Sequence, residues 1–161
     1  MIPSDVFLIN LPSESATEDL AALMAQSLIA GDLLILSGGL GAGKTFFARA
    51  FCYARGLDGA ERVTSPTFAI MQEYPTCPPI VHSDLYRLTE EEEVLELGLE
   101  EARAEGQILL VEWGKPFVDL LGGEAIYLDL SVEPRSAKVH GNSARAQDVI
   151  RALLNSRTGE A

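Results

Sequence analysis

The residues best suited to chemistry form one glycine-rich run that ends in a lysine and a threonine. They fit the pattern G-x-x-x-x-G-K-[ST] at every fixed position: Gly38, Gly39, Leu40, Gly41, Ala42, Gly43, Lys44 and Thr45. Glycines let the backbone curl so that successive N–H groups point inward at phosphate oxygens. Lys44 supplies positive charge for the β- and γ-phosphates, and Thr45 offers a hydroxyl to Mg²⁺. The run therefore predicts a nucleotide phosphate site.

Two acidic residues at predicted strand ends are candidates for handling the metal. Glu112 directly follows the apolar run 108–111, and Asp84 follows the more polar run 80–83. Ligands of open α/β sheets bind outside the carboxyl ends of the strands, so both acids could face the phosphates. With Lys44 they form the predicted catalytic set. The pattern leaves open which acid touches Mg²⁺ directly and which acts through water.

Other residues near the run have two interpretations each. Three hydroxyls lie on a proline-stiffened stretch after the helix: Thr64, Ser65 and Thr67. That stretch is either a switch-like loop that senses the γ-phosphate or a plain connection. Trp113 directly follows Glu112 and is either a core residue or a partner-facing aromatic. We expect His82 to pack within its strand rather than to act as a base.

Turn residues and apolar spacing place these groups on alternating strands and helices. Strands are predicted at 6–9, 33–36, 68–74, 80–83, 107–111, 125–133 and 137–140. Helices are predicted at 15–30 (cap Ser15 or Thr17), at 44–55, after a capping box of Thr89 and Glu92, and from an Asn142 cap to about Leu154. With the glycine-rich loop, this alternation indicates a P-loop NTPase-like three-layer α/β/α sandwich with a mostly parallel central sheet. Residues 1–155 are expected to form one domain, and 156–161 a flexible tail.

The composition limits the kinds of partner that this chain is expected to bind. The 161 residues are 47% hydrophobic and 22% charged, as in a soluble globular domain. Twelve Lys and Arg face twenty-four Asp and Glu, which gives a formal net charge of -12. A protein that binds nucleic acid on its own should carry a basic face, so direct RNA or DNA binding is not expected. Such a charge should also repel ATP unless positive groups at the binding site outweigh it locally.

The sequence also bears on the compartment. Its two cysteines form neither a disulfide framework nor a metal-binding pattern. The first residues lack a basic and then apolar signal region, and no apolar run approaches the roughly 18 residues of a membrane-spanning helix. We therefore expect a cytoplasmic protein with no membrane partner.

The nucleotide base and the reaction class are partly indicated by motifs the chain lacks. None of its lysines, Lys44, Lys115 and Lys138, is followed at the second position by Asp, which argues against a guanine-reading motif. The arginines are scattered, and no insertion long enough for a lid over a small acceptor is evident. These features favour ATP over GTP and weigh against a small-molecule kinase.

Four sequence blocks, in this order, resemble the bacterial TsaE family. They are the glycine-rich run, Thr64-Ser65-Pro66-Thr67-Phe68, His82-Ser83-Asp84-Leu85-Tyr86-Arg87-Leu88 and Leu110-Val111-Glu112-Trp113. The resemblance implies a P-loop ATPase that binds ATP with Mg²⁺ and hydrolyses it slowly. It also implies a role in the threonylcarbamoyl modification of adenosine 37 in tRNA, exerted on a complex of TsaB and TsaD, so that tRNA is met only indirectly.

The resemblance also implies roles for particular residues. Lys44 would hold the phosphates, Thr45 and Glu112 would hold Mg²⁺, and Asp84 would position water or the outer shell of the metal. Residues 64–67 would be switch-like, and Trp113 would serve hydrolysis or a partner. Two more residues are expected to contribute to nucleotide binding: Arg135 near the nucleotide and Glu14 on the adenine side. Two other functions stay open, namely a nucleotide sensor without significant turnover and a small-molecule kinase.

Overall fold

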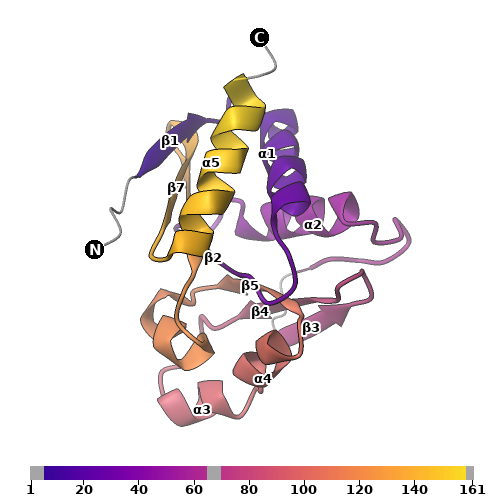
Figure 1. Cartoon of the computed structure of the whole chain (residues 1–161), viewed down its shortest axis with the longest axis vertical. Helices are drawn as coiled ribbons and strands as arrows, with labels where there is room; N and C mark the ends of the chain where they lie inside the picture. The colour runs from indigo at the N-terminus through magenta and orange to yellow at the C-terminus, as the bar shows by residue number, and fades with distance from the viewer. Residues whose placement is uncertain (1–5, 65–69, 159–161) are drawn as a thin grey trace.

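The computed structural model describes residues 6–64 and 70–158 (Figure 1). Within them, seven strands form one sheet in the order β1-β7-β6-β2-β5-β4-β3. The strands are β1 (Phe7–Asn10), β2 (Leu33–Ser37), β3 (Met71–Tyr74), β4 (Ile80–Asp84), β5 (Ile108–Glu112), β6 (Ile126–Val132) and β7 (Arg135–Gly141). The helices are α1 (Glu14–Ser27), α2 (Lys44–Ala54), α3 (Glu91–Leu95), α4 (Leu99–Ala104), the 3-10 helix η1 (Lys115–Leu121) and α5 (Ala144–Thr158).

The sheet is parallel in its centre and antiparallel at both edges. Strands β6, β2, β5 and β4 pair in parallel, whereas β3 pairs antiparallel with β4, β7 with β6, and β1 with β7. The central strands β2 and β5 are apolar on both faces, as expected of strands covered on both sides. The predicted mixed α/β fold is confirmed, with parallel pairing confined to the four middle strands.

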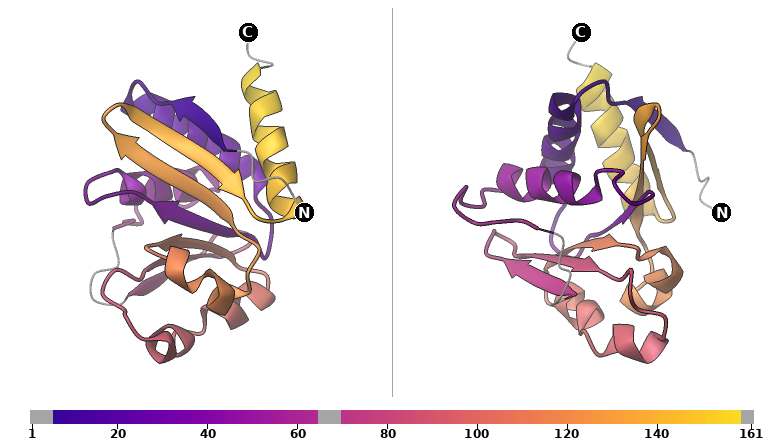
Figure 2. Two further views of the ribbon diagram at one scale, coloured as in Figure 1. Left: turned by 90° about the vertical axis from the view of Figure 1, so that its left-hand side faces the viewer. Right: turned by 180° about the vertical axis from the view of Figure 1, so that it is seen from behind.

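Helices cover both faces of this sheet. Side chains of α1, α2 and α5 pack with one set of strand residues that includes Leu34, Leu36 and Leu110. Side chains of α3, α4 and η1 pack with the alternate set, which includes Ile35 and Val111. Figure 2 shows α1 and α5 together on one side of the sheet, with α3, α4 and η1 gathered at the other end of the molecule. The alternation along each strand thus divides the apolar residues between two cores.

Two predicted helix starts shift because a different side chain provides the cap. Ser13, rather than Ser15 or Thr17, caps α1, since its Oγ accepts from the N–H of Ala16 at 3.1 Å. The first helix accordingly covers Glu14–Ser27 instead of 15–30. The predicted box of Thr89 and Glu92 is wrong, because α3 begins at Glu91 after Glu90 with no side-chain hydrogen bond at its cap.

The last helix also departs from the prediction. Ser143 caps it, with its Oγ accepting from the N–H of Ala146 at 3.0 Å. The predicted cap, Asn142, instead accepts a hydrogen bond from the N–H of Ala125 at 2.7 Å, which ties the end of β7 to the start of β6. The helix continues to Thr158, so residues 156–158 are helical where a tail was predicted.

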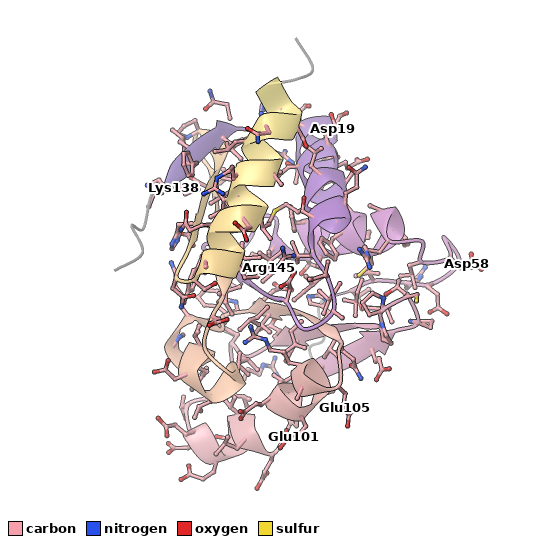
Figure 3. All side chains as sticks on the ribbon, viewed as in Figure 1. Asp19, Asp58, Glu101, Glu105, Lys138 and Arg145 are labelled. Atoms are coloured by element: carbon pink, nitrogen blue, oxygen red, sulfur yellow. The ribbon has the colours of Figure 1, made fainter. Side chains whose placement is uncertain are left out.

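Charged side chains point outward over most of the molecule. Figure 3 shows Asp19 on α1, Asp58 after α2, Glu101 on α4 and Glu105 directly after it, all exposed. The surplus of acidic residues is therefore spread over the surface of several elements.

No helix in the described ranges is long and apolar enough to cross a membrane.

Candidate functional site

The glycine-rich loop joins the end of β2 to the start of α2. Gly38 has φ +140°, and a Cβ there would lie 2.6 Å from the carbonyl oxygen of Leu130 on β6, so only glycine fits without displacement. Gly43 precedes the helix with φ +102° and provides no side-chain cap to its first N–H groups. The loop therefore delivers a helix N-terminus, with its positive dipole end, to the carboxyl ends of the parallel strands.

Lys44 lies buried at the first position of α2. Its Nζ donates to the carbonyl oxygens of Gly38 at 2.7 Å and Gly39 at 2.8 Å and lies 4.6 Å from the centre of the Trp113 ring. Burial lowers the pKa of Lys44, against the opposing attraction of Glu112 and Asp84. The two carboxylates thus offset only part of the cost of burying the Lys44 charge. The binding of an anion beside Lys44 is therefore favoured.

Glu112 ends β5 opposite the threonine of the loop. Its side chain is only 4% exposed, and the Thr45 Oγ1 donates toward it, 3.2 Å from Oε2 and 3.4 Å from Oε1. His82 of β4 lies beneath the carboxylate, with Nε2 2.6 Å from Oε2. Two neighbouring parallel strands and one helix therefore converge on a single buried carboxylate.

Asp84 and Trp113 complete the same edge of the sheet. Asp84 pairs in register with Glu112 across β4 and β5, and its Oδ1 accepts from the N–H of Tyr86 at 2.9 Å. Trp113 adopts φ +59°, an uncommon conformation for a bulky residue, and its ring centre lies 4.8 Å from that of Tyr86. The backbone turn after Glu112 thus places an aromatic ring over Lys44.

These residues border one cavity of about 290 Å³. Its lining is Leu40, Gly41, Ala42, Gly43, Lys44, Thr45, Phe46, Asp84, Glu112 and Trp113. The loop, the lysine, both acids and the tryptophan singled out in the sequence therefore come together. The arrangement offers a cation and a helix N-terminus to a polyanion, and a hydroxyl and two carboxylates to a hard metal ion.

Other predicted site residues lie apart from that lining or outside the described ranges. Arg135, on β7, reaches α1, where its Nη2 is 3.4 Å from the Thr17 hydroxyl. Glu14 is the first residue of that helix, and neither Glu14 nor Arg135 lines the cavity. Thr64 is exposed, whereas the rest of the switch-like stretch, Ser65 and Thr67, lies outside the described residues.

Sequence reasoning missed the part played by His82. It was expected to be a packed strand residue, and it is fully buried, yet it also contacts the carboxylate of the predicted metal ligand. The sequence did contain a signal for this. Side chains alternate between the two faces of a strand, and His82 lies two residues before Asp84, so both lie on the same face. Tyr86, whose ring packs at an angle against that of Trp113, was also missed and carried no comparable local signal.

Fold and site together define a mixed α/β protein with a glycine-rich loop and paired acids at the carboxyl edge of its central parallel strands. A family model described as "Threonylcarbamoyl adenosine biosynthesis protein TsaE" matches residues 11–140. The chain belongs to the TsaE family.

Individual relatives agree with that assignment. The protein named tRNA threonylcarbamoyladenosine biosynthesis protein TsaE from Rickettsia felis is 42% identical over 130 residues, which cover 78% of this chain and 72% of the relative. The protein of the same name from Bacillus subtilis is 40% identical over 113 residues, covering 70% and 69% of the two chains. The crystal structure of Bacillus subtilis YdiB superposes with a TM-score of 0.75 at 25% identity, covering 98% of this chain and 99% of that one.

Proposed function

We propose that this chain is a Mg²⁺-dependent ATP-binding and ATP-hydrolysing subunit required for N6-threonylcarbamoyl modification of adenosine 37 in tRNA. It would act in the cytoplasm on a complex of TsaB and TsaD. Membership of the TsaE family and the names of its relatives support the place in this biosynthesis. The P-loop motif supports the nucleotide chemistry, because the structure positions it between a buried strand and a helix, the context that such a motif requires.

One observation carries the proposal. The amine of Lys44, the hydroxyl of Thr45 and the carboxylate of Glu112 line the same cavity at the start of α2. A glycine turn that arose by chance would not be expected to bring a buried cation and a strand-end acid into the lining of one cavity. A triphosphate bound there would face the cation and the helix N-terminus with its charge, and the acid through a metal ion.

The residues present fit Mg²⁺. Thr45 and Glu112 supply oxygen atoms, the donors this ion prefers, and the Thr45 hydroxyl already lies 3.2–3.4 Å from the two carboxylate oxygens. Among the described residues no group of three or more His, Cys, Asp or Glu could hold a metal ion by itself. That agrees with an ion held by one or two protein ligands together with substrate phosphates. Mg²⁺ would neutralise phosphate charge, and we expect it to bind as the nucleotide complex.

The chain's own residues divide the remaining tasks. Lys44 binds phosphate oxygens by exchanging its two loop carbonyls for anionic partners. Asp84, which pairs in register with Glu112, would orient an attacking water molecule. The Trp113 ring covers Lys44 on one side and limits the access of bulk water to it. Arg135 and Glu14 do not line this cavity, so they would contribute to a part of the nucleotide that lies outside it.

The decisive experiment is reconstitution with TsaB, TsaD and tRNA, counting modified adenosine over many turnovers with and without this chain. ATP hydrolysis is followed in parallel, with Glu112→Gln as the inactive variant and Lys138→Met as a surface control. We expect many turnovers only with the wild-type or control chain, and faster hydrolysis once the partners are present. ATP binding without hydrolysis under all conditions would indicate a sensor, and phosphorylation of a metabolite would indicate a kinase.

A further inference from the structure

Beneath the predicted metal ligand lies a buried pair of ionisable side chains. The His82 side chain is completely buried and that of Glu112 is 4% exposed, and their Nε2 and Oε2 atoms lie 2.6 Å apart. The same Oε2 lies 3.2 Å from the Thr45 hydroxyl. One carboxylate oxygen therefore faces two protein partners, and one of them is fixed in the central sheet.

The direction of the short hydrogen bond follows from the chemistry of a metal ligand. A carboxylate that binds Mg²⁺ is ionised and can only accept hydrogen bonds, so Nε2 of His82 must donate to it. The other ring nitrogen, Nδ1, is buried without a hydrogen-bond partner in the described part of the chain. Leaving a buried polar atom unpaired is unfavourable, and an apolar residue at this core position would avoid that cost.

The position of the ring explains what this arrangement achieves. His82 pairs in register with Leu110, two residues before Glu112 on the neighbouring strand, so the ring stands one pleat below the carboxylate. Both strands belong to the parallel centre of the sheet, and both side chains are buried there. A hydrogen bond from a donor held in the sheet fixes the rotation of the carboxyl group. Oε2 is then engaged by His82, and Oε1 stays available.

We propose that His82 is a positioning residue for Glu112, donating from Nε2 so that Oε1 stays directed to the metal bound with the nucleotide. The inference rests on the proposed function, because it concerns the Mg²⁺-nucleotide complex. It adds a role to a residue that touches neither phosphate nor metal. Partners that orient carboxylate ligands in this way typically change metal affinity by about 10–100-fold when they are removed.

Two amide substitutions separate positioning from packing. The side-chain nitrogen of Gln can occupy the place of Nε2 and donate to Glu112, whereas the nitrogen of Asn corresponds to Nδ1 and cannot reach. Both variants are neutral and polar, so they disturb the core in a comparable way. The readout is the Mg²⁺ concentration that half-saturates binding of a non-hydrolysable ATP analogue, measured by calorimetry, with binding in EDTA as the metal-free reference.

We expect His82→Asn to raise the half-saturating Mg²⁺ concentration by about 10–100-fold. We expect His82→Gln to change it much less, and both variants to bind the analogue in EDTA as the wild type does. An unchanged Mg²⁺ requirement in His82→Asn, or equal impairment in both variants, overturns the positioning role. A wild-type chain that binds no nucleotide at all overturns the proposed function and this inference with it.

A second measurement needs no variant and so does not depend on folding. The chain has two histidines, His82 and His140, and His140 contacts Asp129 instead of the metal ligand. Nitrogen-15 spectra of the imidazoles should show the His82 proton on Nε2. That signal should shift when Mg²⁺ and the analogue are added together, with a smaller change at His140. An Nε2 of His82 that carries no proton, or no shift on loading, refutes the inference.

Discussion

Replacing Lys44 by Met should weaken nucleotide binding without weakening the fold. Methionine keeps the length and apolar stem of the side chain and removes only the charge and its donors. In the unliganded chain Nζ donates to Gly38 and Gly39. Binding exchanges these two neutral acceptors for phosphate oxygens. The substitution therefore removes the difference between the two sets of bonds rather than their whole strength.

The size of that difference follows from the number of bonds. A hydrogen bond from a charged donor contributes about 1.5–3 kcal/mol, and the upper end belongs to pairs in which both partners are charged. Exchanging two bonds from the lower to the upper end gains about 3 kcal/mol. We therefore expect Lys44→Met to raise the Kd for Mg-ATP by about 150-fold.

The unliganded protein should respond in the opposite sense. Burial is the largest influence on Lys44 and lowers its pKa, so the folded state holds this charge less readily than the unfolded chain does. At neutral pH the charge therefore lowers the free energy of unfolding, and Lys44→Met should be at least as stable as wild type. As pH rises through the lowered pKa toward the ordinary lysine value of about 10.4, the folded state releases its proton first. Wild-type stability then rises relative to that of the variant.

The assay combines calorimetric titration with Mg-ATP and urea unfolding at pH 7 and pH 10. Lys138→Met is the matched control, since it removes the same charge from an exposed position on β7 (Figure 3). Two results would refute the reasoning: equal Kd values for wild type and Lys44→Met, or a loss of unliganded stability at pH 7 that the control does not share. The second result would mean that the loop carbonyls and the Trp113 ring compensate fully for the buried charge.

Three further predictions concern other parts of the chain. Glu112→Gln should bind ATP without Mg²⁺ at least as tightly as wild type, because a negative charge is removed, yet hydrolyse Mg-ATP about 100-fold more slowly in a phosphate-release assay. Burial raises the pKa of Cys52 to about 12, whereas Cys77 is exposed, so a thiol reagent at pH 8 should label the native chain once and the urea-unfolded chain twice. Arg103 donates to four backbone carbonyls at 2.6–2.8 Å near the amino end of β2, so Arg103→Ala should lower the free energy of unfolding by about 3–5 kcal/mol while the Kd for Mg-ATP stays unchanged.

The sequence predicted the local elements of the fold better than their arrangement. Apolar runs and glycine stops located β2, β5 and α2 to within one residue, because buried strands and a helix after the glycine-rich loop leave strong patterns. The antiparallel pairing of β1 with β7 joins strands from opposite ends of the chain, and no local pattern encodes it. At the start of α5 the predicted cap was wrong because two candidates, Asn142 and Ser143, stand side by side. Whether Ser143 or Asn142 caps α5 depends on the backbone N–H of Ala125, a residue 17 positions away from Asn142.

The candidate site shows the same division. Motif spacing predicted the loop, Lys44 and Thr45, and the strand-end rule predicted Glu112 and Asp84, all of which line one cavity. The contact between His82 and Glu112 joins residues 30 positions apart and depends on β4 lying directly beside β5. The alternation of side chains along β4 could have placed His82 on the same face of the sheet as the two acids. Only the strand order shows that its ring meets one of them.

Distance and burial reconcile the acidic composition with the proposed ATP site. Most carboxylates lie on the outer surface, as Asp58 and Glu101 do, and exposed charges more than about 8 Å away are largely screened at physiological salt. Lys44 lies in a poorly hydrated position, where its charge acts more strongly on a bound anion. The acids that remain unscreened are Glu112 and Asp84, which line the cavity itself. Their repulsion of bare ATP should make the nucleotide bind more weakly without Mg²⁺ than with it, so that the metal aids binding as well as catalysis.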